Sequence, residues 1–320
     1  MNASLRTWVL VGLLALLAAV PPLAAWLNEP FYLDLMRRVM IFAIAAASLN
    51  LILGYGGMVS FGHAAYLGIG AYAVGVLGFY GIHDGWLQWG VAIGASALVA
   101  LAIGAVSVRT SGIYFIMITL AFTQMLYYLG VSLAEYGGDD GLRLAMRSQF
   151  PGLVDLADPA AFYYVVLGIL AVSIYLVHRL VNSRFGMVIR AARSNEARSR
   201  AIGFSPYPYR LAAFVISGAM CGLAGALLVN QTSFLTPEFM NWTRSGELMF
   251  MVILGGIGTA SGPLLGAAAL LLLEDLLQGW ELLPKEAVRE HWQLYLGVIL
   301  VLVVLFAKRG LAGLIPGKHE

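Results

Sequence analysis

The topology of this chain depends on one apolar stretch, residues 246–277, which reads GELMFMVILGGIGTASGPLLGAAALLLLEDLL. A helical crossing of a membrane core needs roughly 20 apolar residues, so the stretch is too long for one crossing and rather short for two. The sequence GGIGTASGP, from Gly255 to Pro263, interrupts it near the middle and is typical of a turn. We interpret the stretch as a helical hairpin, and a re-entrant loop is the alternative.

The remainder of the chain also has the composition of a membrane protein. Of its 320 residues, 60% are hydrophobic and 11% are charged, whereas soluble domains have about 25% charged residues. Mean hydropathy is +0.83. Together with the hairpin, eight further runs predict an all-α transmembrane bundle of about ten spans: Thr7–Leu27, Arg38–Leu53, Val59–Tyr80, Trp86–Val108, Ile113–Leu133, Phe162–Leu180, Leu211–Val229 and Leu294–Ala307.

A basic segment sets the orientation: HRLVNSRFGMVIRAARSNEARSRAIGFSPYPYR, residues 178–210. It holds seven arginines and one acid, Glu196, and cytoplasmic loops carry such an excess of positive charge. The tail with Lys308, Arg309 and Lys318 should lie on the same side. An even number of crossings must therefore join the basic segment to the tail. The spans Leu211–Val229 and Leu294–Ala307 supply two, and the hairpin supplies two more. Both termini are therefore expected in the cytoplasm.

The predicted external loop, residues 134–160, has the opposite charge. Its acids outnumber its arginines: Glu135, Asp139, Asp140, Asp155 and Asp158 against Arg143 and Arg147. Arg37 and Arg38 also fall outside in this topology, against the positive-inside rule. Residues 231–245 are expected to form a second outer loop with a short interfacial helix.

The basic segment has the form of a short amphipathic helix. Its apolar side carries Phe185, Val188, Ile189 and Ala192, and its basic side carries Arg184, Arg190 and Arg193. We interpret it as a helix offered to a partner on the inner face. The alternative is that its arginines only fix the topology and contact lipid headgroups.

Polar residues at membrane depth are candidates for a route through the bundle. Gly or Ala fills half of GYGGMVSFGHAAYLGIGAYAVG, residues 54–75, and such small residues let helices approach closely. His63 could line the route or be an ordinary packing residue. The Gln124 amide needs a hydrogen-bond partner, which could be a neighbouring helix or a passing polar solute. The candidates are Ser60, His63, Tyr72, Thr119, Thr123 and Gln124.

Enzyme signatures are missing from the sequence. It contains no G-x-x-x-x-G-K-[ST] motif, no pair of cysteines and no H-x-x-x-H, and Cys221 is its only cysteine. We expect no metal site, no cofactor bound by this chain and no nucleic-acid partner, because its basic residues are local to the loops. Ionisable residues are nearly absent from the predicted spans, which argues against a proton relay. Energy for transport should come from a partner.

Five blocks of sequence carry a family resemblance: LNLILGYGGMVSFGHAAYLGIGAY, GIYFIMITLAFTQM, GGDDGL, SRFGMVIRAARSNEARSRAIG with YRLAAFVISGAMCGLAGAL, and FMVILGGIGTASGPLLGAA. They extend from Leu49 to Ala268. In these blocks the chain resembles the membrane permease subunits of ABC importers for branched-chain amino acids, and more closely the larger of the two permeases. The resemblance implies a single permease domain over residues 1–320, of the type II importer kind, in a bacterial cytoplasmic (inner) membrane.

The resemblance also implies partners: a second permease that completes a heterodimer, two ATPase subunits that bind ATP and Mg²⁺, and a soluble substrate-binding protein. The inner loop, residues 178–210, would couple to an ATPase, and Glu196, Ala197 and Arg198 before Gly203 depart from the usual E-A-A pattern. Tyr136 replaces the usual threonine of the outer motif. The implied coupling residues are Gly186, Arg190, Ala192, Arg193, Glu196, Ala197 and Gly203, and those that dock the binding protein are Gly137, Gly138, Asp139 and Asp140.

Other functions stay open at this point. Permeases for urea, short amides or sugars belong to the same class and are separated poorly by this sequence. An ion-coupled secondary transporter would need no ATPase, but the basic helix and the lack of buried acids count against it. The exact substrate is not encoded in any motif of the chain.

Overall fold

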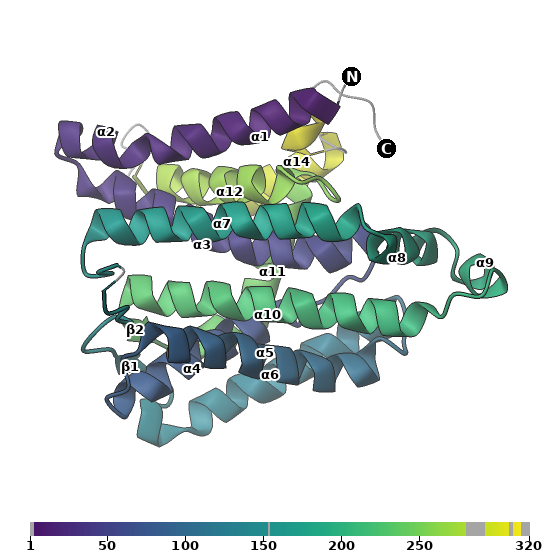
Figure 1. Cartoon of the computed structure of the whole chain (residues 1–320), viewed down its shortest axis with the longest axis horizontal. Helices are drawn as coiled ribbons and strands as arrows, with labels where there is room; N and C mark the ends of the chain where they lie inside the picture. Colours follow the sequence, from purple (N-terminus) through teal and green to yellow (C-terminus); the bar gives the residue numbers. More distant parts are fainter. Residues whose placement is uncertain (1–2, 153, 280–291, 307–309, 315–320) are drawn as a thin grey trace.

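The computed structural model describes residues 3–152, 154–279, 292–306 and 310–314, which form mainly helices (Figure 1). In chain order they are α1 (Ala3–Ala18), α2 (Val20–Leu27), α3 (Pro30–Asn50), the π-helix η1 (Leu51–Tyr55), α4 (His63–Phe79), α5 (Gly85–Ser107), α6 (Ile113–Ser132), η2 (Ala134–Tyr136), α7 (Pro159–Val181), α8 (Arg184–Ser194), α9 (Glu196–Ala201), α10 (Pro206–Thr232), η3 (Pro237–Met240), α11 (Trp242–Gly255), α12 (Gly262–Gly279), α14 (Trp292–Phe306) and η4 (Leu311–Leu314). Two short strands, β1 (Leu142–Arg143) and β2 (Phe234–Leu235), pair antiparallel.

Within the described residues, six helical stretches are long and apolar enough to cross a membrane. They are α1 with α2 from Trp8, α3 with η1, α5, α6, α7 and α10. The predicted membrane-spanning, all-α fold class is therefore confirmed in outline. The predicted hairpin turn is confirmed too, because α11 ends at Gly255 and α12 begins at Gly262.

The helices begin where the sequence supplies caps. The Asp84 carboxylate accepts from the backbone N–H groups of Trp86 and Leu87, at 2.9 and 3.3 Å, and starts α5. Asp158 does the same for α7, where Pro159 takes the first helical position. Helices α5 and α7 both begin at the end of the bundle that holds β1 and β2 (Figure 1).

Small residues bring α4 and α10 into backbone contact at the centre. A Cβ on Gly70 would lie 1.9 Å from the carbonyl oxygen of Gly222, and one on Gly225 would lie 1.8 Å from that of Leu67. No larger residue fits at either glycine without moving a helix. The packing role weighed for the small residues of 54–75 is thus the one seen at this crossing.

Two predicted segments differ from expectation because the chain is unwound inside the bundle. Residues 56–62 are not helical, and α4 starts only at His63, although the sequence predicts a span from Val59. Residues 231–245 contain the expected short helix, η3, and begin beside β1 of the outer loop, but residues 233–241 fold onto the bundle, where Leu235 lies against Gly75 and Met240 lies against Gly68. Hydropathy does not distinguish an apolar segment of irregular backbone from an apolar helix.

The two unwound segments belong to two antiparallel units. In the first, α3 is followed by residues 56–62 and α4, and in the second α10 is followed by residues 233–241 and α11. Each unit packs on the other: α4 and α5 lie along α10, and α11 and α12 lie along α3. Inverted repeats with broken helices are typical of transporters.

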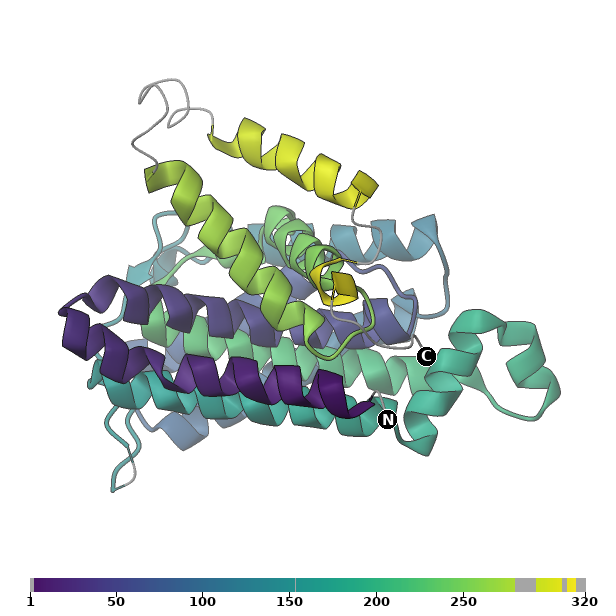
Figure 2. The same cartoon turned by 90° about the horizontal axis from the view of Figure 1, so that it is seen from above.

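The two ends of the bundle differ. Helices α8 and α9 project from one end, beyond α7 and α10, and the β1–β2 pair and η2 lie at the other (Figures 1 and 2). The α11–α12 turn lies at the α8 end, because the Gly258 N–H donates to Asn50 just before η1. Arg37, on α3 toward the opposite end, is buried, pairs with Asp34 and lies 4.8 Å from the ring of Phe162.

Candidate functional site

The breaks before α4 and α11 meet in the interior. Phe61, the last residue but one before α4, presents its carbonyl to the hydroxyls of Thr123 and Ser245, at 3.0 and 2.8 Å. Its N–H donates to the Thr119 hydroxyl, at 3.2 Å, and the Ala64 N–H donates to Ser245, at 2.9 Å. These side chains replace the hydrogen bonds that a continuous helix would have made, as unwound backbone in a membrane requires.

The His63 side chain is held by one buried hydroxyl, that of Ser217. The Ser217 hydroxyl donates to the Ser48 carbonyl oxygen, at 2.5 Å, so it accepts from the imidazole Nε2, which lies 2.7 Å away. This order assigns the ring proton to Nε2. Cys221 donates its Sγ–H to the His63 carbonyl, at 3.3 Å. The three side chains have no exposed surface and join α4 to α3 and α10.

Four of the six pathway candidates, Ser60, His63, Thr119 and Thr123, lie together in this interior cluster with no exposed surface. Ser60 accepts from the Gly62 N–H, at 3.0 Å. Tyr72 lies apart, where a Cβ on Gly130 of α6 would be 3.2 Å from its hydroxyl. Gln124 is partly exposed on α6, on the same helix as the exposed Met125 and Tyr128.

Phe61 and Trp242 stand at the surface of the two breaks. Their ring centroids are 6.3 Å apart, Phe61 is partly exposed and Trp242 is 44% exposed. Sequence reasoning missed both, together with Ser217 and Ser245. In the sequence, Ser217 and Ser245 are marked only as hydroxyl groups within apolar helices. Such a hydroxyl can make a structural hydrogen bond or line a substrate route, and the sequence does not distinguish the two.

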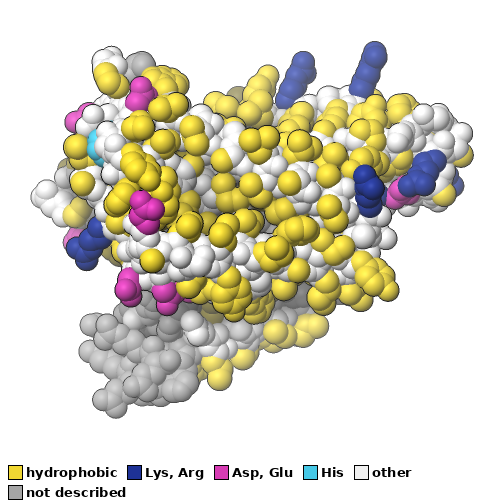
Figure 3. Space-filling view, turned by 90° about the horizontal axis from the view of Figure 1, so that it is seen from below, with side chains coloured by type: hydrophobic (Ala, Val, Ile, Leu, Met, Phe, Trp, Pro, Cys, Tyr) yellow, Lys and Arg dark blue, Asp and Glu magenta, His cyan; other side chains and the backbone are white. Residues whose placement is uncertain are grey.

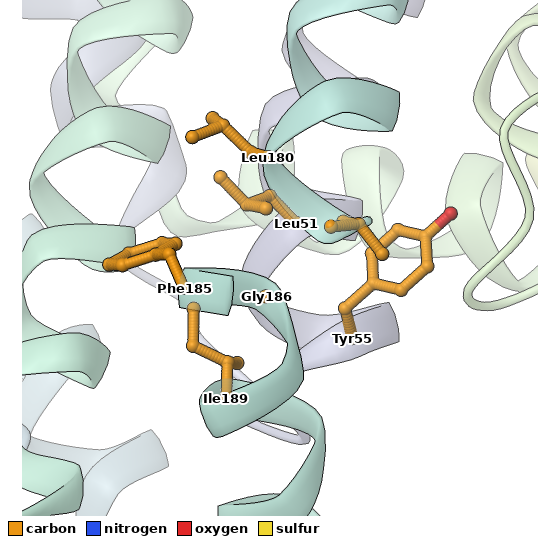
Figure 4. A pocket seen from close by; sticks show the side chains of 7 residues that line it. Leu51, Tyr55, Leu180, Phe185, Gly186 and Ile189 are labelled. Carbon is orange, nitrogen blue, oxygen red and sulfur yellow. The ribbon is translucent and has the colours of Figure 1, made fainter. Parts of the chain in front are cut away.

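At the other functional region, α8 packs against η1. Leu51 and Tyr55 of η1 and Leu180, Phe185 and Ile189 of the α7–α8 corner line one apolar crevice (Figure 4). The Ser183 hydroxyl accepts from the Gly186 N–H and caps α8. A Cβ on Gly186 would lie 2.2 Å from the Val181 carbonyl oxygen, so this glycine is needed for the tight corner.

A polar chain continues from α8 into the bundle. The Arg193 guanidinium donates to the Gly54 carbonyl of η1, and the Arg193 stem packs on Gly57, where a Cβ would lie 2.9 Å from its Cγ. Asn50, one turn earlier, accepts from the Gly258 N–H and donates to the Thr259 carbonyl, both at 2.9 Å. The projecting helix, the π-helix and the α11–α12 turn are thereby joined.

Glu196 fixes α9 to α10. Its carboxylate accepts from Arg200, at 2.5 Å, and from Arg210, at 2.6 Å. Burial opposes its ionisation, but Arg210 and Arg200 outweigh that effect and hold the pKa of Glu196 below its ordinary value. Helix α9 ends at Ala201, and Gly203 follows its cap residue with a φ of +90°, which suits glycine.

The predicted coupling residues divide into two groups. Gly186 and Ala192 are buried inside the chain, and Arg190 is partly buried. Ala197 is exposed on α9, and so are three large apolar side chains on the projection: Met187, Ile202 and Phe204. Of these, Ile202 and Phe204 lie farther along the loop than the apolar face predicted for the helix, whereas Met187 lies within that helix.

The outer glycines form a tight turn beneath an acidic tip. Gly137, Gly138 and Gly141 all have positive φ, and a Cβ on Gly137 would lie 2.2 Å from the Gly141 carbonyl oxygen. The turn places Asp139 and Asp140 in the solvent. Among the residues that the structure describes, no three His, Cys, Asp or Glu side chains gather as a metal site would require.

Comparison with known proteins decides the family. The model of the family described as branched-chain amino acid transport system / permease component matches residues 31–305. The chain belongs to this family. The resemblance predicted from the sequence blocks is confirmed, and so is the conclusion that the chain is a transport component and not an enzyme.

Individual relatives have related descriptions. The high-affinity branched-chain amino acid transport system permease protein LivM of Escherichia coli (strain K12) is 28% identical, over 94% of this chain and 74% of its own. LivH of the same strain is 23% identical, over 85% and 91%. The autoinducer 2 import system permease protein LsrC of Enterobacter sp. (strain 638) is 29% identical, over 87% and 81%.

Proposed function

We propose that this chain is one permease of an ABC importer that carries branched-chain amino acids across a bacterial cytoplasmic membrane. Family membership carries this proposal, and similarity to both LivM and LivH supports a pair of different permeases. ATP and Mg²⁺ would be bound by two partner ATPases. A soluble binding protein would dock at the acidic tip with Asp139 and Asp140.

We place ten crossings in this chain. Six helical stretches of the described residues have spanning length, α12 and α14 supply two more, and the short helices α4 and α11 are completed by residues 56–62 and 233–241. With the basic α8–α9 projection in the cytoplasm, both termini lie inside. Arg37 does not oppose this orientation, because its charge is paired with Asp34 within the protein.

We place the route for substrate on the surface of the two breaks, between this chain and the second permease. Phe61 and Trp242 give that surface an apolar wall, which suits aliphatic side chains, and Gln124 adds an amide nearby on α6. Ser60, His63, Thr119 and Thr123 would act behind this wall by holding the unwound backbone. Tyr72 would line the route farther along α4, beside Gly130 of α6.

The α8–α9 projection would dock on an ATPase through Ala197, Ile202 and Phe204. Large apolar side chains at the solvent end of a membrane protein indicate a partner. Ala197→Trp should therefore abolish co-purification of the ATPase subunits from cells that express the whole importer. Ala145→Trp, at an exposed alanine of the opposite end, is the matched control. Full ATPase retention by Ala197→Trp would contradict this docking mode.

One observation favours a second substrate class. The similarity to LsrC, whose description names autoinducer 2, keeps sugar-like compounds as the alternative. Ligand binding by the partner binding protein distinguishes the two: leucine, isoleucine or valine is expected, and binding of a sugar-like compound alone would replace the substrate assignment without changing the class of transporter.

A further inference from the structure

A cavity of about 310 Å³ lies between the α5–α6 connection, α9 and the start of α10. Its polar wall is formed by Arg109, Thr110 and Ser111 of the connection, by Glu196 and Arg200 of α9, and by Arg210 of α10. None of the residues predicted for substrate passage lines it. The cavity is therefore separate from the breaks before α4 and α11.

The charges around the cavity do not balance. Three guanidinium groups face one carboxylate, and that carboxylate, Glu196, already pairs with Arg200 and Arg210. In the described part of the chain Arg109 forms no ion pair, and its guanidinium lies 5.6 Å from the ring centroid of Tyr207. The wall thus carries two positive charges in excess.

Donors of the wall differ in how far they are used. Arg210 donates to the Glu196 carboxylate, at 2.6 Å, and to the Ala192 carbonyl, at 3.1 Å. The exposed Arg109 side chain makes no hydrogen bond to another described residue, so its donors are free for an anionic oxygen. Guanidinium groups match phosphate oxygens in both charge and geometry.

The position of the cavity suggests how such a ligand arrives. The cavity lies where the apolar helices α5 and α6 meet the basic end of the molecule, and Val106 and Ile113 beside it are exposed. On the face shown in Figure 3, apolar side chains cover the middle, and basic and acidic side chains lie together at the α9 end. A phosphate held there could belong to a lipid whose acyl chains cover the apolar surface.

We propose that this cavity binds an anionic phosphate group, supplied by a phospholipid headgroup or by a soluble phosphate ester. The ligand would join Arg109 of the α5–α6 connection to Arg200 of α9 and so hold the ATPase-docking projection against the bundle. The inference goes beyond the proposed function, and only its location at the inner membrane surface rests on that proposal.

The test measures binding to the purified full chain in detergent, without ATPase subunits, so that failure of ATPase docking leaves the result unaffected. The probes are radiolabelled phosphatidylglycerol, phosphatidylcholine as the zwitterionic lipid, and inorganic phosphate and glycerol 3-phosphate as soluble phosphates. Arg109→Gln and the double variant Arg109→Gln/Arg200→Gln are compared with Arg184→Gln, which removes an exposed arginine of α8 outside the cavity.

We expect phosphatidylglycerol retention to fall roughly fivefold for each arginine removed, with little change in Arg184→Gln and little retention of phosphatidylcholine. Failure of the soluble phosphates to compete would assign the site to a lipid. Arginine-dependent binding of a soluble phosphate without phosphatidylglycerol would assign it to a soluble ester. Partial recovery in Arg109→Lys/Arg200→Lys, with unchanged gel-filtration elution, excludes misfolding. Equal binding of every probe by the wild type and the double glutamine variant would overturn the proposal.

Discussion

Glycines determine how closely the two central helices approach. The α10 backbone occupies the space that a side chain at Gly70 of α4 would fill, and the α4 backbone occupies the corresponding space at Gly225 of α10. Gly70→Leu should therefore lower the stability of the purified chain by at least about 1–3 kcal/mol, the usual cost of overfilling a packed interior. The measurement is thermal unfolding followed by gel filtration. Gly90→Leu on α5, where nothing lies within 4 Å, should unfold near the wild-type temperature, and equal loss in both would contradict the contact.

The Asn50 amide joins the α11–α12 turn to the end of α3. Asn50 makes two hydrogen bonds to backbone groups more than 200 residues away in sequence, at Gly258 and Thr259. Asn50→Leu should leave those groups without partners at a cost of about 1–3 kcal/mol each. We expect a lower unfolding temperature and weaker substrate stimulation of ATPase activity. Wild-type values for both would show that the turn does not depend on this side chain.

At the scale of elements, α8 reaches the first break through η1, a π-helix of the kind often found at functional positions. Arg193 is the polar contact between them, and the crevice in Figure 4 is the apolar one. Arg193→Ala should keep the ATPase subunits bound, because its guanidinium contacts Gly54 of this chain. Substrate stimulation of ATP hydrolysis should fall. If the variant instead lost its ATPase subunits, and the complexes that kept them showed normal substrate stimulation of ATP hydrolysis, Arg193 would belong to the surface that contacts the ATPase.

The α9 helix carries a pH-dependent contact. The pKa of Glu196 is lowered in the folded chain, so its pairs with Arg200 and Arg210 are complete above the ordinary carboxyl pKa. They are lost as pH falls through the lowered value. A nitroxide at Ala201, in a Cys221→Ser background, should be restrained at neutral pH and become mobile in acid. In Glu196→Gln it should be mobile already at neutral pH, and identical spectra for the two proteins would contradict this contact.

Much of the bundle follows from hydropathy and charge, because each span is a local property of its own residues. The turn at Gly255–Pro263 is an example. The breaks were not predictable in this way, since residues 56–62 and 233–241 are held by hydroxyls and side chains from distant helices. Ala192 gives a second example. The sequence places it on the apolar face of an amphipathic helix, but only the structure shows that the bundle covers this face.

For the whole molecule, the topology gives a labelling pattern. Single cysteines at Asp139 and Gln278 should react with an impermeant reagent added outside intact cells, and a cysteine at Thr259 should react only after the inner face is exposed. The background is Cys221→Ser. Outside labelling at Thr259 would contradict the ten crossings, because that turn lies at the same end as the α8–α9 projection.

The central claim is that ATP hydrolysis by partner subunits drives transport through this chain. Its most direct test is leucine uptake into proteoliposomes that contain the two permeases and two ATPases, with the binding protein outside and ATP inside. We expect accumulation that requires ATP and the binding protein, and none when this chain alone is given a proton gradient. Proton-driven leucine accumulation by this chain alone would contradict the account.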